Sequence, residues 1–388
     1  MVHNFYQQRG GEDIAFHAEK ALLESNGHQV PVYIRQNDEI KRYGPVEKAS
    51  LPFRTVWAWD SSKQMRKLVD TEKPDVVHFH NTFPLVSPSA YSACREANIP
   101  VVQSLDNPRL MCPAATLFRE GSICEECVGK IAPWPGVLHA CYRKSRVQTG
   151  VVAAMLTVHR YLKTWEKLVD TYLVATDFYH QKFVDAGLPP EKIAVKPHFI
   201  APDPGPTQEA QSYALFAGRL SPEKGVLTLL NAWERLKAIP LKIRGEGDLL
   251  RDVQERASDR NYHIEMVPRL SRQDLTHLFQ RARFLVWPSE GYYETFGLVA
   301  VEAFACGIPV IASRVGVMEE IVRDRVTGLH FKAGDPNDLA EKVEWAWTHP
   351  REMETMGREA RSEYEVKYTA ERNYELLMGV YRRALRGK

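Results

Sequence analysis

The chain has 388 residues, enough for two or three domains, and its 44% hydrophobic and 26% charged residues are ordinary for a globular protein. A net charge of +2 gives no case for a nucleic-acid partner held by phosphate attraction, and no apolar run approaches the ~18 residues that span a bilayer. The first residues lack the charged and apolar regions of a secretory signal, so we expect a cytoplasmic protein, with peripheral contact at the inner face of the membrane still open.

Short apolar runs alternate with amphipathic segments in the first half of the chain. Residues 75–80 and 100–105 have the composition of buried strands, and the segment 87–97 between them carries apolar residues at helical spacing. Another strand is expected at residues 171–175. Strand–helix–strand units of this kind predict a parallel sheet with crossover helices.

Prolines and a glycine interrupt this alternation in residues 197–212, a composition typical of a linker. Beyond it, strands are expected at four places, namely residues 213–217, 240–244, 283–287 and 308–312. We therefore predict an α/β protein with two doubly wound domains, residues 1–204 and 205–369, whose ligands bind beyond the carboxyl ends of the strands. The tail, about residues 370–388, has a helical pattern and is predicted to dock back on the first domain.

Two carboxylates bracket the first half of the small, apolar segment 296–306, which is expected to be a buried helix. Glu294 stands at the strand-to-helix turn, and Glu302 lies on the helix itself. A buried carboxylate needs a partner, so Glu302 requires a hydroxyl or an amide, while the backbone N–H groups at the start of a helix favour an anion. Two structural carboxylates, one capping and one solvated, are the alternative.

A pair of basic residues follows the strand expected at residues 213–217. Arg219 and Lys224 stand between two glycines, Gly218 and Gly225. Arginine supplies a planar fork for phosphate oxygens, and lysine supplies a point charge. Such a pair is often solvated surface, but its place at the carboxyl end of a strand favours a binding site.

Together these two segments resemble the family 4 retaining glycosyltransferases, which have the GT-B fold: two Rossmann-like domains that face each other across a cleft. The similarity spans nearly the whole chain, and it continues through Gly316 and residues 8–13, 74–81, 169–197, 320–322, 327–329 and 335–336. The resemblance implies transfer of a sugar, with retention, from a UDP- or GDP-sugar to a glycan or lipid-linked acceptor, in surface polysaccharide synthesis. No Asp-x-Asp pair follows a strand end, so no catalytic metal or other catalytic cofactor is expected.

The resemblance also implies roles for individual residues. Arg219 and Lys224 hold the donor diphosphate, Glu294 contacts the transferred sugar, and Glu302 accepts hydrogen bonds from the ribose. Backbone groups add to phosphate binding or approach the donor and acceptor closely at five further positions: Phe296, Gly297, Leu298, Gly10 and Gly11.

Three further positions on the donor side have a second interpretation or depart from the family pattern. His80 ends a strand near the expected cleft, where a structural histidine is the alternative. Asp106 stands where many relatives have a histidine that faces the donor sugar, and Val317 replaces the second glycine of a pair. A GT-B epimerase or hydrolase is one alternative to the transferase. Asp106 and Val317 support another, a catalytically weakened nucleotide-sugar binding protein.

Four of the six cysteines crowd into a short segment, at positions 112, 124, 127 and 141. A Cys-x2-Cys pair with two flanking thiols is compatible with a structural zinc site, and we predict that Cys112, Cys124, Cys127 and Cys141 hold zinc. Unliganded thiols, an iron–sulfur cluster or a disulfide are the alternatives.

An aromatic and basic stretch in the first half is a candidate to touch an acceptor or a membrane surface. It contains Phe53, Arg54, Trp57, Trp59, Lys63, Arg66 and Lys67. A partly packed, solvated helix is the favoured interpretation.

Overall fold

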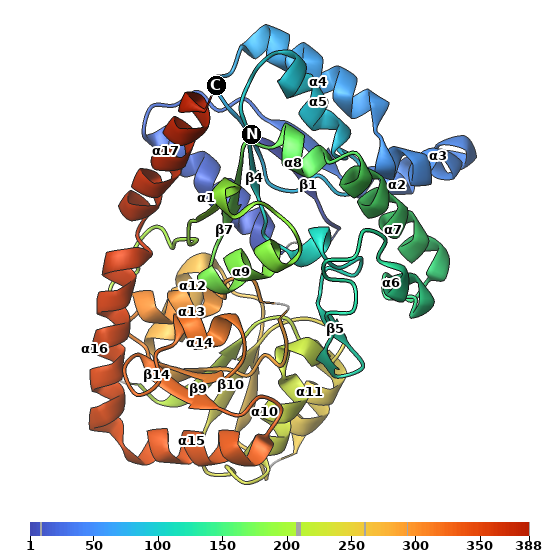
Figure 1. The fold of residues 1–388 in the computed structure, drawn as a ribbon. Coiled ribbons are helices and arrows are strands. Elements are labelled where there is room, and N and C mark those ends of the chain that lie inside the picture. The colour runs from blue at the N-terminus through green and yellow to red at the C-terminus, as the bar shows by residue number, and fades with distance from the viewer. Residues whose placement is uncertain (8–9, 207–210, 260, 293, 388) are drawn as a thin grey trace. The chain divides into compact units, whose positions relative to one another are not determined.

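The structure is a computed structural model that describes residues 1–388 except 8–9, 207–210, 260, 293 and 388. It divides into two compact units (Figure 1). The N-terminal unit consists of Met1–Leu117, Cys124–Pro197 and Tyr374–Lys388, and the C-terminal unit consists of Phe118–Ile123 and His198–Asn373. The chain therefore passes between the units at residues 117–118, 123–124, 197–198 and 373–374. The boundaries expected from the sequence were at 204–205 and 369–370. Residues 8–9 of the resemblance, 207–210 of the linker, and Tyr293 and Lys388 lie outside the described residues.

The N-terminal unit is built on a parallel six-stranded sheet with the order β2-β1-β3-β4-β7-β8. The strands are β1 (Val2–Phe5), β2 (Tyr33–Gln36), β3 (Val77–Phe79), β4 (Val101–Ser104), β7 (Thr171–Val174) and β8 (Ile193–Val195). Its helices are α1 (Gly11–Ser25), α2 (Glu39–Arg42), α3 (Pro45–Val56), α4 (Trp59–Glu72), α5 (Ser89–Glu96), α6 (Trp134–Leu138), α7 (Arg146–Tyr161), α8 (Thr164–Leu168) and α9 (Asp177–Asp185).

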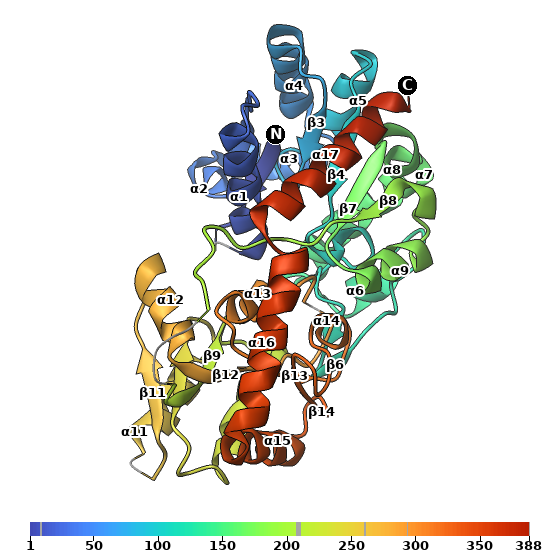
Figure 2. The same cartoon turned by 90° about the vertical axis from the view of Figure 1, so that its left-hand side faces the viewer.

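The last helix of the chain, α17 (Ala370–Arg386), packs on this sheet from residue 374 onward (Figure 2). Leu377, Val380 and Tyr381 are buried in one cluster with Leu23 of α1 and Val102 of β4. The N-terminal unit therefore includes a helix from the end of the chain, which follows the C-terminal unit in the sequence.

The C-terminal unit has a second parallel six-stranded sheet, with the order β11-β10-β9-β12-β13-β14. The strands are β9 (Tyr213–Ala217), β10 (Leu241–Arg244), β11 (Ile264–Val267), β12 (Ala282–Trp287), β13 (Val310–Ser313) and β14 (Gly328–Phe331). The helices are α10 (Val226–Trp233), α11 (Leu250–Ser258), α12 (Arg272–Gln280), α13 (Leu298–Ala305), α14 (Val317–Ile321), α15 (Pro336–Thr348) and α16 (Pro350–Lys367), and β5 (Phe118–Arg119) pairs with β6 (Ser122–Ile123) in a hairpin.

The central strands of the C-terminal sheet are buried on both faces, as their unbroken apolar runs require. Four of the five residues of β9, from Tyr213 to Phe216, are buried, and helices cover the sheet. Its strand order is that of the doubly wound nucleotide-binding fold, in which the order reverses between two neighbouring strands. That reversal lies between β9 and β12 here, and between β1 and β3 in the N-terminal sheet.

Candidate functional site

The reversal point of each sheet is followed by residues that the sequence singled out. Arg219 and Lys224 come directly after β9, and Glu294 comes after β12. In the N-terminal unit, Gly10 and Gly11 come after β1, and His80 comes after β3. A doubly wound sheet binds ligands outside the carboxyl ends of its strands at such a point, so each unit has one candidate edge.

Gly225 brings Lys224 against the end of β12. The residue has a left-handed backbone, with φ of 67°, and a Cβ atom added there would lie 1.8 Å from the carbonyl oxygen of Pro288. No residue with a side chain fits this contact without a shift of the backbone. The glycine therefore allows the short 3₁₀ helix Pro222–Lys224 to approach the loop that carries Glu294.

Lys224 and Glu294 form an ion pair at the edge of the C-terminal sheet. The Lys224 ammonium donates to Glu294 Oε1, which also accepts from Trp287 Nε1 at 3.2 Å and from Ser289 Oγ at 3.0 Å. Burial by itself would raise the pKa of Glu294, but Lys224 and these hydrogen bonds lower it below its ordinary value. The carboxylate is thus ionised, and it is 11% exposed.

Helix α13 begins beside this ion pair. Gly297, with φ of 92°, precedes the helix, and a Cβ atom there would lie 2.1 Å from the ring of Trp287. Phe296 is buried, with its ring against His198 and Tyr368, so its side chain belongs to the core. What Phe296, Gly297 and Leu298 can offer a ligand is therefore backbone, at the end of a helix that favours anions.

Glu302 lies further along α13 and is partly buried. Burial raises its pKa to about 7, against the opposing effect of Arg272 and Arg244. Near neutral pH this carboxyl group is therefore able to accept hydrogen bonds as an anion or to donate one as an acid.

Arg244 and Arg269 also line a cavity of about 310 Å³ at the carboxyl ends of β10 and β11. Gly245 contributes to its wall, where an added Cβ atom would lie 2.0 Å from the carbonyl oxygen of Gly218. This cavity was not predicted from the sequence. The strand that ends at Gly245 was recognisable, but β11 was not predicted, so nothing indicated that two strand ends meet there.

The edge of the N-terminal sheet is more enclosed. His80 is 3% exposed; its Nε2 lies 3.5 Å from Glu19 Oε2, and its Nδ1 lies 3.7 Å from Asp106 Oδ2. His80, Asp106 and Arg109 are among the residues that line a cavity of about 40 Å³, which is room for a few water molecules. Glu12 is a nearby acid that the sequence analysis missed: burial, with Asp106 and Asp13, raises its pKa to about 8.

Gly10, directly before α1, has no steric reason to be a glycine in the structure. Gly10 has an extended backbone, with φ of −121°, and an added Cβ atom would have no neighbour within 4 Å. Its N–H donates to the Asp13 carboxylate at 3.0 Å, which fixes the first turn. Gly11 is the first residue of the helix.

Both halves of the chain match models of known protein families. A profile described as "Glycosyltransferase Family 4" matches residues 10–204, and one described as "Glycosyl transferases group 1" matches residues 201–363. The chain belongs to glycosyltransferase family 4. Its fold is the GT-B fold of that family.

Individual relatives of this glycosyltransferase match only part of the chain or have a low sequence identity to it. An uncharacterised glycosyltransferase of Methanocaldococcus jannaschii is 35% identical over 170 residues, 44% of this chain and 46% of that one. O-antigen chain mannosyltransferase B of Escherichia coli is 36% identical over 138 residues, 33% of this chain and 34% of that one. The chain thus spans less than half the length of these curated relatives. The crystal structure of Anabaena HepE in complex with UDP superimposes with a TM-score of 0.68 at 15% identity, over 97% of this chain and 98% of that one.

The cysteines of the glycosyltransferase do not form the compact cluster that the zinc prediction requires. No disulfide joins them. Burial raises the pKa of Cys127 to about 11, and Cys112, Cys141 and Cys124 raise it as well, so all four lie in one region. Among the described residues, however, the three ligand-type side chains that come within 4.8 Å of one another are Glu19, His78 and His80 rather than cysteines. The structure therefore places the four cysteines in one region without a compact set of ligand atoms, and zinc there stays a prediction.

The side chains of Glu19 and His78, in the group with His80, already have charged or hydrogen-bonding partners within the protein. Lys196 Nζ lies 2.6 Å from Glu19 Oε1, and His78 shares hydrogen bonds with Tyr381 Oη at 2.8 Å and Ser104 Oγ at 2.9 Å. A cation placed among these groups would face the Lys196 ammonium at short range, which is strongly unfavourable inside a protein. We interpret the group as structural.

Val317, which replaces the second glycine of a pair, does not need a positive φ in the structure. It is the first residue of α14 and is buried, while Gly316 before it takes the positive φ, 57°. No described helix is long and apolar enough to cross a bilayer.

Proposed function

We propose that this glycosyltransferase moves a sugar from a UDP- or GDP-sugar, with retention at the anomeric carbon and without a catalytic metal. The observation that carries the proposal is the Lys224–Glu294 ion pair at the reversal point of the C-terminal sheet, beside the start of α13. A cation, a sugar-binding carboxylate and a helix N-terminus are the groups that a nucleotide-diphosphate sugar requires.

In the proposed complex, the donor diphosphate lies against Arg219, Lys224 and the backbone of residues 296–298. Glu294 then accepts hydrogen bonds from hydroxyls of the transferred sugar. The Lys224 ammonium exchanges part of its interaction with Glu294 for a phosphate oxygen, because both anions compete for it. The proximity of Glu302 to Arg244, which lines the 310 Å³ cavity, supports ribose at Glu302 and the base in that cavity.

The reaction would proceed on one face of the sugar. The bond from the anomeric carbon to the phosphate oxygen breaks, the acceptor oxygen bonds to the same face, and the leaving phosphate oxygen takes the acceptor proton. The protein then has to stabilise the charge that grows on the diphosphate, and Arg219 and Lys224 are suited to this task. From the resemblance, Gly10, Gly11, His80 and Asp106 are assigned to the donor sugar or the acceptor.

The acceptor is proposed to be a glycan or a lipid-linked sugar of a surface polysaccharide, made in the cytoplasm. The partial similarity to O-antigen chain mannosyltransferase B supports this proposal. The mannosyl donor implied by that name and the UDP complex of Anabaena HepE are the reasons to test both nucleotides.

The test is a screen of UDP, GDP, UMP and GMP by thermal unfolding. A ligand at 100 times its Kd stabilises the folded state by about 2.7 kcal/mol, so a true donor nucleotide raises the melting temperature measurably. We expect one diphosphate to act more strongly than its monophosphate on the wild type, and to lose this advantage in the Arg219→Ala/Lys224→Ala variant. The assigned diphosphate site would be refuted if each diphosphate raised the melting temperature only as much as its monophosphate. It would also be refuted if the Arg219→Ala/Lys224→Ala variant kept the advantage of the diphosphate.

The competing activities are separated by a second assay with the diphosphate sugar that the screen identifies. A transferase consumes the donor much faster when acceptor is present, whereas a hydrolase consumes it equally fast without acceptor, and an epimerase changes the sugar without releasing it. A binding protein consumes none.

Structural zinc at the four cysteines remains a separate proposal, supported by their spacing and by their common region. Elemental analysis of protein purified without added metal tests it: about one zinc per chain is expected. Absence of zinc, with four reactive thiols in that segment, would remove the proposal and leave the transferase assignment intact.

A further inference from the structure

A short hairpin from the first third of the chain belongs to the C-terminal unit. Its strands, β5 (labelled in Figure 1) and β6 (labelled in Figure 2), lie within Phe118–Ile123. The residues on both sides, up to Leu117 and from Cys124 onward, belong to the N-terminal unit. The N-terminal part of the sequence therefore supplies a piece of the unit that carries Lys224 and Glu294.

The backbone of the hairpin is closely defined. Its strands have two residues each, and the two residues that join them, Glu120 and Gly121, have φ of 51° and 79°. Positive φ at both central positions is the requirement of the type I′ turn, which matches the twist of the flanking strands. At the base of the hairpin, the Cys124 N–H donates to the Leu117 carbonyl oxygen at 2.9 Å. Phe118 therefore starts from a well-defined backbone.

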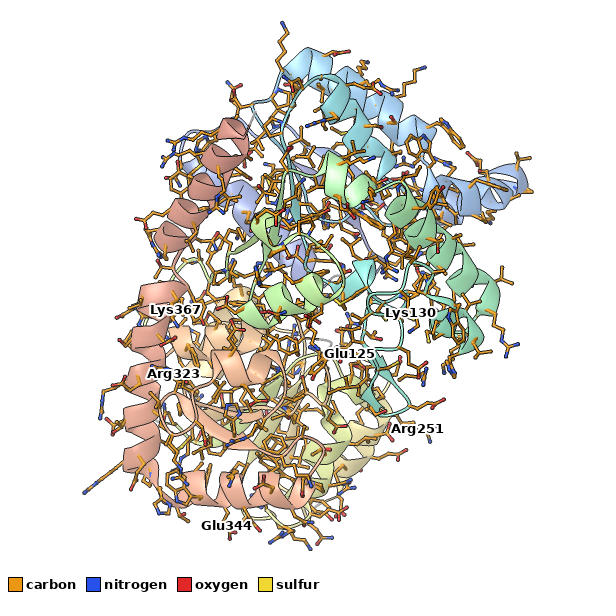
Figure 3. The ribbon with its side chains drawn as sticks, viewed as in Figure 1. Glu125, Lys130, Arg251, Arg323, Glu344 and Lys367 are labelled. Atoms are coloured by element: carbon orange, nitrogen blue, oxygen red, sulfur yellow. The ribbon has the colours of Figure 1, made fainter. Side chains whose placement is uncertain are left out.

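Both chain segments that lead to the hairpin are held in the N-terminal unit. Leu117, directly before it, is 1% exposed. Glu125, which is labelled in Figure 3, forms an ion pair with Lys182 of α9 at 2.5 Å. A two-stranded hairpin is marginally stable by itself, so a hairpin this short depends on such anchors and on what its side chains contact.

The ring of Phe118 packs on Gly291. A Cβ atom added at Gly291 would lie 2.6 Å from Phe118 Cδ2 and 3.3 Å from Phe118 Cε2. The φ of Gly291 lies outside the left-handed region, so the ring rather than the backbone conformation excludes a side chain there. Both residues belong to the C-terminal unit.

Gly291 belongs to the loop between β12 and α13, and it stands three residues before Glu294. The residue before it, Glu290, accepts a hydrogen bond from Thr228 Oγ1 of α10, which fixes the first part of the loop from one side. Phe118 then covers the next residue. The ring therefore restricts the path of the loop directly before the carboxylate that pairs with Lys224.

We propose that Phe118 is a positioning residue for the donor sugar, because its ring holds this loop where Glu294 can accept hydrogen bonds from the sugar hydroxyls. The inference rests on the proposed function, in which Glu294 contacts the transferred sugar. A binding group acts well only when neighbouring side chains hold it within about 0.5 Å of its productive position. The diphosphate contacts at Arg219 and at the start of α13 do not involve the hairpin, so the nucleotide without its sugar should bind independently of Phe118.

The test compares the binding of UDP with that of UDP-glucose, and of GDP with that of GDP-mannose, by calorimetry on the full chain. For the nucleotide sugar that the wild type binds, we expect Phe118→Ala to weaken the affinity at least about tenfold, because the loop is no longer restrained. The corresponding nucleoside diphosphate should bind as it does to the wild type, which also shows that the variant is folded. Tyr161→Ala is the control, since it removes an aromatic ring that is 83% exposed on α7, and it should change neither affinity.

A second variant tests the contact itself. Gly291→Ala places a methyl group against the ring and should weaken binding of the nucleotide sugar in the same way. The double variant Phe118→Ala/Gly291→Ala should be no weaker than either single variant, because both changes remove one contact. Losses that multiply in the double variant would overturn the inference, and so would a Phe118→Ala variant with wild-type affinity for the nucleotide sugar. In these two cases the wild type still binds its donor and the proposed function stands, whereas a wild type that binds neither nucleotide sugar would overturn both.

Discussion

Each unit of this glycosyltransferase contains a lysine–glutamate ion pair close to the edge where its sheet reverses, and the two pairs differ in their exposure. In the N-terminal unit, Lys196 and Glu19 lie 2.6 Å apart with side chains that are 2% and 1% exposed. In the C-terminal unit, the side chains of Lys224 and Glu294 are 17% and 11% exposed. The first pair is closed to any ligand, whereas the second is open to one.

The enclosed pair connects elements that are far apart in the sequence. Glu19 belongs to α1, Lys196 follows β8 directly before the chain leaves the unit, and His78, beside Glu19, bonds to Tyr381 of α17. These charges fix where the chain departs from the N-terminal unit and where it returns. The open pair joins two loops at one edge of the C-terminal sheet, because Lys224 follows β9 and Glu294 follows β12. Exposure, rather than the presence of a buried ion pair, therefore separates a structural role from a functional one.

The largest expected effect is that of Lys196→Met on stability. Removing one partner of a buried ion pair leaves an uncompensated charge, which typically costs about 3–5 kcal/mol. We expect a loss of this order in the free energy of unfolding, measured by urea denaturation. The double variant Glu19→Leu/Lys196→Met should recover most of it, and a double variant as unstable as the single one would contradict the charge argument.

The same pair predicts the response of stability to acid. Although burial alone raises the pKa of Glu19, Lys196 and the two histidines beside it lower it to about 2. A carboxyl with a lowered pKa stabilises the fold above its unfolded pKa, near 4.5, and loses this contribution as pH falls toward 2. The wild type should therefore lose stability between pH 4.5 and 2 more steeply than the Glu19→Leu/Lys196→Met variant.

The next largest effect on stability is expected for Gly225→Ala, which changes the geometry of the open pair. An alanine in left-handed backbone costs about 1–2 kcal/mol, and the clash with Pro288 adds to this. We expect a lower melting temperature and weaker nucleotide binding, because Lys224 moves away from the edge of the sheet. Gly10→Ala is the matched control for stability, since its backbone is extended and an added methyl group has no neighbour within 4 Å. A similar loss of stability in both variants would show that the contact with Pro288 is not the cause.

Lys224→Ala and Arg219→Ala should each lower kcat/KM at least about tenfold, or ~1.4 kcal/mol of transition-state stabilisation. Their effect on unfolding should be smaller than that of Lys196→Met, because Glu294 keeps its bonds from Trp287 and Ser289 and has access to water. Lys242→Ala is the control, since this lysine pairs with Glu265 at 3.0 Å on β10. Unchanged kinetics in both variants would refute the assignment of the open pair to catalysis.

Only the open pair, Lys224 and Glu294, could be singled out from the sequence. The strands and glycines around this site are recognisable in the sequence. The order of its residues, Arg219, Lys224, Glu294 and Glu302, matches a known family. Glu19 and Lys196 are separated by most of the N-terminal unit, and nothing in either local segment shows that they meet.

In the fold, too, only features with a clear local sequence pattern were predicted. The central strands are continuous apolar runs and were predicted, as was the helix at residues 87–97. Strand β11 was missed, because its four residues Ile264–Val267 include a charged one and are only partly buried. The cavity at the ends of β10 and β11 was missed with it. The cysteine spacing was compatible with zinc, but spacing carries no information on whether the loops bring the sulfur atoms together.

A third carboxyl group extends the comparison. Among the described residues no lysine forms an ion pair with Glu302, and the pKa of Glu302 is raised rather than lowered. Burial raises it to about 7, so the neutral form is favoured in the folded protein. A raised carboxyl pKa contributes stability that is present below the unfolded value, near 4.5, and is lost as pH rises to about 7. The Glu302→Gln variant should lack this dependence.

Nucleotide binding should have the opposite dependence on pH. If both ribose hydroxyls donate to Glu302, the donor binds the ionised form, and the apparent Kd depends on the fraction of enzyme in that form. Binding of UDP-glucose, whose diphosphate does not titrate in this range, should therefore tighten by up to about tenfold between pH 6 and pH 8. Calorimetry at several pH values measures it, and Glu302→Gln should bind weakly at every pH. If the donor proves to be a GDP-sugar, the same dependence is expected, because the ribose is unchanged. A wild-type affinity that stays flat from pH 6 to pH 8 would mean that the ribose is held elsewhere and that Glu302, like Glu19, belongs to the structure rather than to the site.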